Sequence, residues 1–123
     1  MSRLFLVIGA LAAGLAVMAG AFGAHGLENR VSADRLDTFE TGVKYQMYHA
    51  LALFIVAWAS TQFTASAVSY AGYCFLAGMV IFSGSLYVLV LTDTPWLGAI
   101  TPIGGLAFIA GWLLLAWGIW SST

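Results

Sequence analysis

The chain has 123 residues, which is room for one domain, and 62% of them are hydrophobic whereas only 7% are charged. A soluble domain usually carries about a quarter charged residues, so this chain needs lipid around it rather than water. The formal net charge of −1 excludes a strongly basic protein built to bind nucleic acid, and no Lys/Arg cluster is dense enough to hold anionic lipid. The single cysteine, Cys74, excludes an intrachain disulfide and is predicted to be a small buried hydrophobic residue.

Four apolar stretches are long enough to cross a bilayer, which takes about 20 residues of helix. The predicted spans are residues 4–24, 45–63, 68–91 and 97–120. The first stretch is longer than the apolar core of a usual signal peptide, so we expect it to be retained as a helix. The sequence therefore predicts an all-α fold: a polytopic membrane protein with a four-helix transmembrane bundle, formed by residues 1–123 as a single domain.

All charged residues except Arg3 and Asp93 lie between the first and second predicted spans. Ser32 is a favourable N-cap there, and the acidic Asp34 falls in the first turn, where the helix dipole favours negative charge. Apolar residues then recur every three or four positions, opposite a charged face. This pattern predicts a short amphipathic helix over residues 33–44 that lies in the membrane interface and leads into the second span. The alternative is a docking face for a soluble partner.

Small residues mark one face of the first span. Ala12, Ala16, Gly20 and Ala24 recur every four residues and form a continuous stripe. Because lipid gives helices no hydrophobic reason to associate, close backbone approach at small residues is a common way to pack them. We therefore expect this stripe to be buried against neighbouring helices.

The Thr101-Pro102 pair near the start of the fourth span has two interpretations. Thr101 caps a helix that begins at Pro102, whose missing N–H is no loss in the first turn. Alternatively, Pro102 kinks a helix that has already begun near Trp96. The first interpretation is the one we favour.

Polar side chains gather at one end of the predicted bundle, next to the loop that follows the first span. Antiparallel connection brings the ends of the first and third spans and the starts of the second and fourth to this boundary. The candidate residues are His25, Tyr45, Gln46, His49, Ser83, Ser85, Tyr87 and Thr101. Lipid offers them no partner, so they must pair with each other, with water or with a ligand. Two interpretations stay open: hydrogen bonds between helices, or a site for a small molecule or ion.

The two histidines are central to this hypothesis. We expect His25 and His49 to approach the same polar volume, and we expect His49 to point into the bundle with Ser85, Tyr87 or Thr101 as its partner. Histidine is a good metal ligand, but two histidines that are not four residues apart on one helix do not specify zinc or haem. No metal site, cofactor or catalytic residue is predicted.

Several of these residues also carry a resemblance to a known family. The motifs are residues 20–27 (GAFGAHGL), 45–53 (YQMYHALAL), 83–87 (SGSLY), 100–105 (ITPIGG) and 111–112 (GW). They resemble the family of small bacterial membrane proteins catalogued as domain of unknown function 423, which has a eukaryotic branch of small transmembrane proteins. The resemblance implies four membrane helices and a multi-pass protein of the bacterial cell inner membrane. It implies no activity and no site residues.

Three hypotheses for function follow. The first is a structural or accessory membrane protein whose partners are lipids, other membrane proteins or further copies of itself. The second is a binder or transporter of a small molecule, lipid or ion that uses the polar residues around His25 and His49. The third is an enzyme acting on lipid or quinone, which would need a histidine paired with Tyr45 or Asp93 as acid and base. The distribution of Lys and Arg predicts that the loop over residues 25–44 is cytoplasmic and that both termini lie outside.

Overall fold

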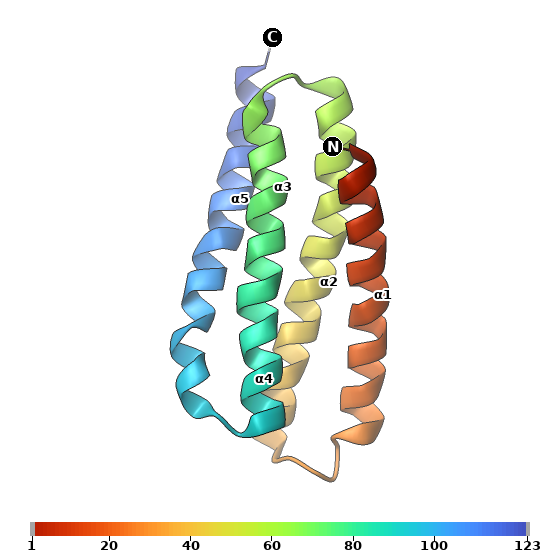
Figure 1. The fold of residues 1–123 in the computed structure, drawn as a ribbon, viewed down its shortest axis with the longest axis vertical. Coiled ribbons are helices and arrows are strands. Elements are labelled where there is room, and N and C mark those ends of the chain that lie inside the picture. The colour runs from red at the N-terminus through yellow and green to blue at the C-terminus, as the bar shows by residue number, and fades with distance from the viewer. Residues whose placement is uncertain (1, 123) are drawn as a thin grey trace.

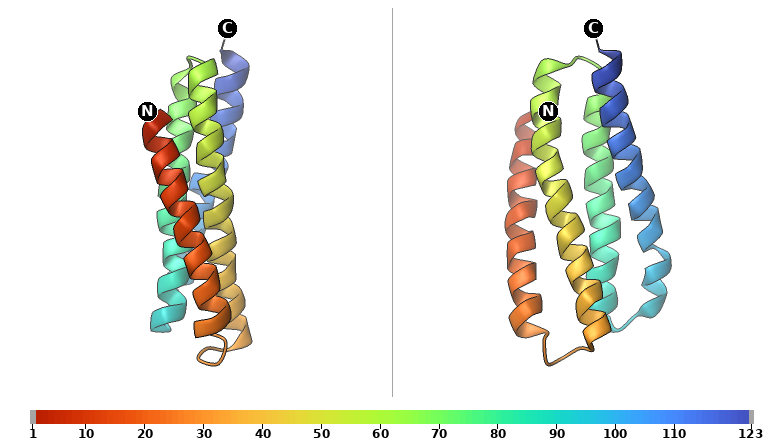
Figure 2. Two further views of the ribbon diagram at one scale, coloured as in Figure 1. Left: turned by 90° about the vertical axis from the view of Figure 1, so that its right-hand side faces the viewer. Right: turned by 180° about the vertical axis from the view of Figure 1, so that it is seen from behind.

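The structure, a computed structural model, describes residues 2–122, and every regular element in this range is a helix. In chain order the elements are α1 (Ser2–Gly26), α2 (Ala33–Gln62), α3 (Ser66–Gly78), the π-helix η1 (Met79–Ser83), α4 (Gly84–Thr92), the 3₁₀ helix η2 (Pro95–Ala99) and α5 (Thr101–Ser121). Because α3, η1 and α4 follow one another without a break, the chain forms four antiparallel rods (Figure 1). We call the end with the loop over residues 27–32 the loop-one end; the two termini lie toward the other end (Figure 2).

Three of the rods are long enough and apolar enough to cross a membrane. They are Ser2–Gly26, Ser66–Thr92 and Pro95–Ser121. The residues predicted to form the first span, 4–24, are helical within α1. Those predicted for the third span, 68–91, lie in α3, η1 and α4, and those predicted for the fourth, 97–120, lie in η2 and α5. By length and composition α2 is not among the three, because charged residues crowd its first turns and Gln46 and His49 follow them.

The amphipathic segment over residues 33–44 is not a helix of its own. It forms the first turns of α2, which runs unbroken from Ala33 to Gln62. The predicted N-cap is confirmed, since the Ser32 hydroxyl accepts a hydrogen bond of 3.2 Å from the backbone N–H of Arg35. The apolar side of this segment is covered by protein: Phe39 and Gly42 are buried, and Phe39 packs against Tyr87 of α4. Tertiary contact therefore keeps the segment in line with the rest of α2.

The stripe of small residues on α1 is only partly where the sequence predicts it. The face that packs on α2 includes Ala16, which is 1% exposed, whereas Ala24 is exposed. Gly9 and Gly23 belong to the buried face instead, with Gly23 lying against Phe39. The prediction for Ala24 is wrong because an exact four-residue spacing drifts around a helix of 3.6 residues per turn, while the contact alternates spacings of three and four.

The start of α5 also differs from the favoured interpretation. Ile100 is the N-cap residue, and Thr101, the first residue of α5, makes no capping hydrogen bond with its side chain. Pro102 does lie in the first turn, where its missing N–H is no loss. The turn before it is the 3₁₀ helix η2, so the chain enters α5 through a tighter coil rather than through a kinked α-helix.

The π-helix η1 lies where α5 approaches most closely. A Cβ added to Gly104 would lie 2.8 Å from the Cα of Phe82, a distance that real Cβ atoms do not reach. Gly104 thus brings the backbone of α5 against the backbone of η1. Wider π turns are rare and are found mostly as single insertions in α-helices. No feature singled out in the sequence analysis predicts this one.

The contact between α5 and η1 generates a stability prediction. Gly104→Ala should lower the free energy of unfolding in detergent by about 1–3 kcal/mol, because the added methyl group overlaps the backbone of Phe82 and the helices must move apart. Thermal unfolding followed by circular dichroism measures the change. Gly14→Ala and Gly84→Ala are matched controls, since an added Cβ meets no atom within 4 Å at either position. Equal loss of stability in all three variants would contradict the packing argument.

Candidate functional site

The structure does not gather the candidate residues into one polar volume. His25 is exposed in the last turn of α1, whereas His49 is buried at 4% exposure, more deeply within the bundle. The expectation that both histidines share a site is therefore wrong. The first physical reason is depth: Gly23 packs against Phe39 and Gly9 packs against Ala50, so His49 lies about 15 Å or more along the bundle from the level of His25. Rotation adds to this separation, because two residues carry the side chain of His25 away from the buried face marked by Gly23.

His49 is fixed by partners on two helices. Its Nδ1 lies 2.7 Å from the backbone oxygen of Tyr45, and its Nε2 accepts a hydrogen bond of 3.1 Å from Nε1 of Trp112 on α5. A carbonyl only accepts and an indole N–H only donates, so Nδ1 carries the proton and Nε2 does not. The ring also stacks on Phe108 with centroids 3.6 Å apart. His49 is thus the neutral Nδ1–H tautomer, and both of its nitrogens are occupied.

The hydrogen-bond partner of His49 differs from those predicted from the sequence. His49 does point into the bundle, but its partner is Trp112 rather than Ser85, Tyr87 or Thr101. Thr101 begins α5 and Trp112 follows about three helical turns deeper, at the level of His49. The signal was present in the sequence: a tryptophan in the middle of a span needs an acceptor for its N–H, and His49 is an acceptor at that depth.

A second polar contact joins three rods through Gln46. Its Nε2 donates to the backbone oxygen of Ala12 on α1 at 2.8 Å, and its Oε1 accepts from the hydroxyl of Tyr87 on α4 at 2.6 Å. Both the nitrogen and the oxygen of the side-chain amide therefore form hydrogen bonds between helices.

Tyr45, one turn earlier than His49 on α2, is 39% exposed and packs its ring against Phe82.

The hydroxyl groups of the third rod serve its backbone and its neighbours. Ser83 donates to the carbonyl of Gly42 on α2 at 2.7 Å. Ser85 lies 2.9 Å from the carbonyl of Phe82 and 2.5 Å from the hydroxyl of Thr101. Each hydroxyl has one proton, and the Thr101 hydroxyl also lies 3.4 Å from the carbonyl of Leu97. Because the contact of Ser85 with Phe82 is shorter, we assign Ser85 as the donor to Phe82 and Thr101 as the donor to Ser85. These bonds tie the π-helix η1 to α2 and tie α4 to the start of α5.

The polar interior of the described residues is complete in itself. No buried side-chain nitrogen or oxygen among residues 2–122 lacks a hydrogen-bond partner. Within the same range, no group of three His, Cys, Asp or Glu side chains is placed to hold a metal ion. Of the candidate residues, Gln46 lines a cleft of about 210 Å³ between α1 and the third rod, together with apolar side chains such as Ile8, Leu76 and Met79. The candidate residues thus make hydrogen bonds between helices, and Gln46 also lines an apolar cleft.

Comparison with known proteins identifies the family. A family model described as "Protein of unknown function (DUF423)" matches residues 19–105. The chain belongs to this family. The resemblance predicted from the motifs is thereby confirmed, and four of the five motifs lie within the matched range, residues 111–112 being the exception.

Curated relatives agree with the family match. "UPF0382 membrane protein YwdK" of Bacillus subtilis (strain 168) is 49% identical over 92% of this chain and 93% of its own length. "UPF0382 membrane protein SH2409" of Staphylococcus haemolyticus (strain JCSC1435) is 52% identical over 92% of both chains. No solved structure matches. The chain is therefore a membrane protein of an uncharacterised family, and the names of its relatives transfer no activity to any residue.

The contact between Trp112 and His49 can be tested by substitution. Trp112→Phe should lower the free energy of unfolding by about 1–2 kcal/mol, because Nε2 of His49 loses its donor inside the bundle. In a double-mutant cycle with His49→Leu the two losses should be less than additive by about 1 kcal/mol. Trp117→Phe is the control, since Trp117 is 62% exposed on the same helix. Additive losses would show that the two side chains are not coupled.

Proposed function

We propose that all four rods cross the membrane and that α2 is the second span. α2 has 30 residues, about 45 Å of helix, against a hydrocarbon core of about 30 Å. Its last 18 residues, Tyr45 to Gln62, would cross the core, and its charged first turns would lie at the interface. The polar side chains that lower its hydropathy do not oppose this placement, because Gln46 and His49 are satisfied by partners inside the protein.

The proposed topology puts both termini on one side of the membrane. Arg30, Arg35 and Lys44 lie at the loop-one end, against Arg3 at the other, so the loop-one end is proposed to be cytoplasmic. Reporters that are active only in the cytoplasm, fused to either terminus, should both be inactive, and a reporter inserted after Glu28 should be active. Termini on opposite sides would overturn the four-span arrangement, and two active terminal reporters would overturn the orientation alone.

We further propose that the protein is a structural or accessory component of the bacterial inner membrane, which binds other membrane proteins or further copies of itself. The single observation that carries this proposal is the completeness of the polar interior. Tyr87, Gln46, His49 and Trp112 hydrogen-bond to one another or to backbone and leave no buried group aimed at a substrate. Chemistry on a bound molecule needs such a group within hydrogen-bond reach. What remains for function is the outer surface.

One observation favours a second candidate, the binding of a small molecule or lipid. The cleft of about 210 Å³ between α1 and the third rod opens on the outer surface, and Gln46 gives it one polar side chain. An apolar cavity with a single polar group is a common form of ligand site. In this candidate the polar residues from Tyr45 to Thr101 hold the walls of the cleft in position rather than contacting the ligand.

Native mass spectrometry separates the two candidates. If the protein is an accessory component, the chain released from its own membrane in mild detergent should have the mass of an assembly larger than one chain of 13.0 kDa. His49→Gln should leave that assembly intact, as should the control His25→Gln at an exposed position. A single chain carrying one non-lipid small molecule, lost in His49→Gln but kept in His25→Gln, would instead establish the binding function.

A further inference from the structure

A cavity of about 440 Å³ lies at the loop-one end, apart from the hydrogen-bonded interior around Gln46 and His49. It is formed where the end of the first loop and the start of α2 face the end of α4. Its walls are Arg30, Val31, Ser32, Arg35, Val90, Leu91 and Asp93. In the proposed topology this cavity lies at the membrane interface on the loop-one side, beside the charged first turns of α2.

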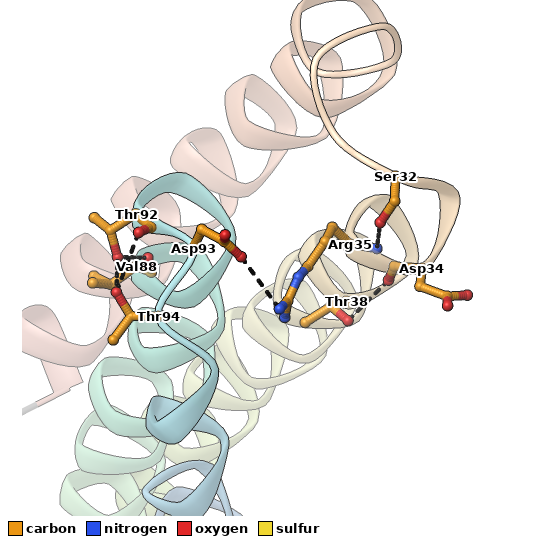
Figure 3. Close-up of polar contacts among 8 residues, drawn as sticks. All are labelled: Ser32, Asp34, Arg35, Thr38, Val88, Thr92, Asp93 and Thr94. Carbon is orange, nitrogen blue, oxygen red and sulfur yellow. Dashed lines mark hydrogen bonds and ion pairs between the residues drawn. The ribbon is translucent and has the colours of Figure 1, made fainter.

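The charged wall of the cavity has a net charge of +1. Arg35 pairs with Asp93 through an Nη2 to Oδ1 distance of 3.3 Å, while Arg30 makes no ion pair with any described residue. The carboxylate of Asp34 points away from the Arg35–Asp93 pair (Figure 3). Two cationic residues and one anionic residue therefore line the cavity, and their net charge of +1 matches the single negative charge of a phosphodiester.

Asp93 is held at the rim by the end of α4. It is the C-cap residue, in the left-handed conformation with φ of 51°, and it is the only non-glycine residue in the described range with a positive φ. Aspartate tolerates this conformation better than most residues. Its side chain is 85% exposed although it contacts Arg35, so an oxygen of the carboxylate remains open to a further donor.

The other wall of the cavity is apolar. Val31, Val90 and Leu91 line it, and Val90 and Leu27 belong to a small buried cluster directly beneath. A free inorganic anion gains nothing from such a wall. A glycerophospholipid does, because its phosphate sits at the headgroup level while its glycerol and first methylenes lie toward the hydrocarbon.

The sequence has no dense Lys/Arg cluster that would hold anionic lipid, but the fold places Arg30 and Arg35 in one cavity with Asp93. From this arrangement we propose that the cavity binds the headgroup of a glycerophospholipid. Arg30 and Arg35 contact the phosphodiester, Asp93 accepts a hydrogen bond from the ammonium or hydroxyl group of the headgroup, and Val90 and Leu91 contact the glycerol end of the acyl chains. The proposal rests on the four-span topology, which places the cavity at the bilayer boundary. It does not depend on whether the protein is an accessory component or a binder at the cleft near Gln46.

The test measures lipid retention by native mass spectrometry. The purified full chain is exchanged into detergent with phosphatidylglycerol or, separately, with a glucosyl diacylglycerol that has no phosphate. One phosphatidylglycerol per chain should bind, and Arg30→Gln/Arg35→Gln should bind it about tenfold more weakly. Arg3→Gln, which removes an arginine at the other end, should bind as the wild type does. Equal binding of the two lipids, or full retention by the double variant, would overturn the proposal.

Two further arms identify the source of the phosphate and the role of Asp93. Millimolar inorganic phosphate should not displace the lipid; displacement at that concentration would show a free-anion site and overturn the lipid assignment.

Asp93→Asn raises the net charge of the cavity by one. In a mixture of phosphatidylglycerol and phosphatidylethanolamine, this variant should therefore shift the bound population about fivefold toward phosphatidylglycerol. An unchanged ratio would remove Asp93 from the site. The reporter topology is read independently, so a failure of the four-span arrangement is not confused with a failure of lipid binding.

Discussion

Hydrogen bonding across α2 is the constraint on which the arrangement of the other helices depends. In a bilayer core a polar side chain has no solvent partner, so each must find one within the protein. Gln46 reaches α1 in one direction and α4 in the other, and His49 reaches α5. α2 accordingly packs on α1 and on the third rod along most of its length, and its buried residues run from Phe39 to Ala59. Thus α2, whose hydropathy is too low for a typical membrane-spanning helix, is the helix with the most contacts to the rest of the protein.

The arrangement of the helices also depends on close approach between the backbones of α5 and the third rod. The contact of 2.5 Å between the hydroxyls of Ser85 and Thr101 requires α5 to lie tightly against the third rod. On that side of α5, a Cβ has no room at three glycines: Gly104, Gly111 and Gly118. The π-helix η1 meets this contact at Phe82, and Ser85 bonds to the Phe82 carbonyl. We interpret Ser85 and Thr101 as groups that satisfy backbone where the helix is widened, which explains why hydroxyl groups stand in an otherwise apolar stretch.

The sequence predicts elements well and partners poorly, for physical reasons. Apolar length and the N-cap signal at Ser32 depend on local chemistry, so the helix over residues 4–24 and the start of α2 were predictable. Which side chains meet depends on how each helix is rotated and how far it is shifted along its axis. The position of a residue within its span predicts neither of these. The sequence predicted His25 and His49 at the same boundary, but the register of α1 on α2 puts them at different levels and rotation turns His25 outward. It predicted Ser85, Tyr87 or Thr101 as the partner of His49, but the axial offset of α5 pairs His49 with Trp112. The π-helix depends on a contact between distant segments and leaves no local pattern.

The distribution of satisfied and unsatisfied polarity indicates where recognition must occur. Inside the bundle, Tyr87, Gln46, His49 and Trp112 use their donors and acceptors on one another and on backbone, so a ligand there would have to break an existing hydrogen bond. At the loop-one end, by contrast, polar groups remain available to another molecule. Arg30 has no ion pair in the described chain, and one carboxylate oxygen of Asp93 is open to a further donor. An arginine at the membrane interface lies among lipid phosphates at high local concentration. A buried histidine such as His49 contacts neither lipid nor solvent. We therefore interpret the polar interior as the frame that sets the ends of α2 and α4 opposite each other, and we propose the charged cavity between those ends as a site where the protein recognises lipid.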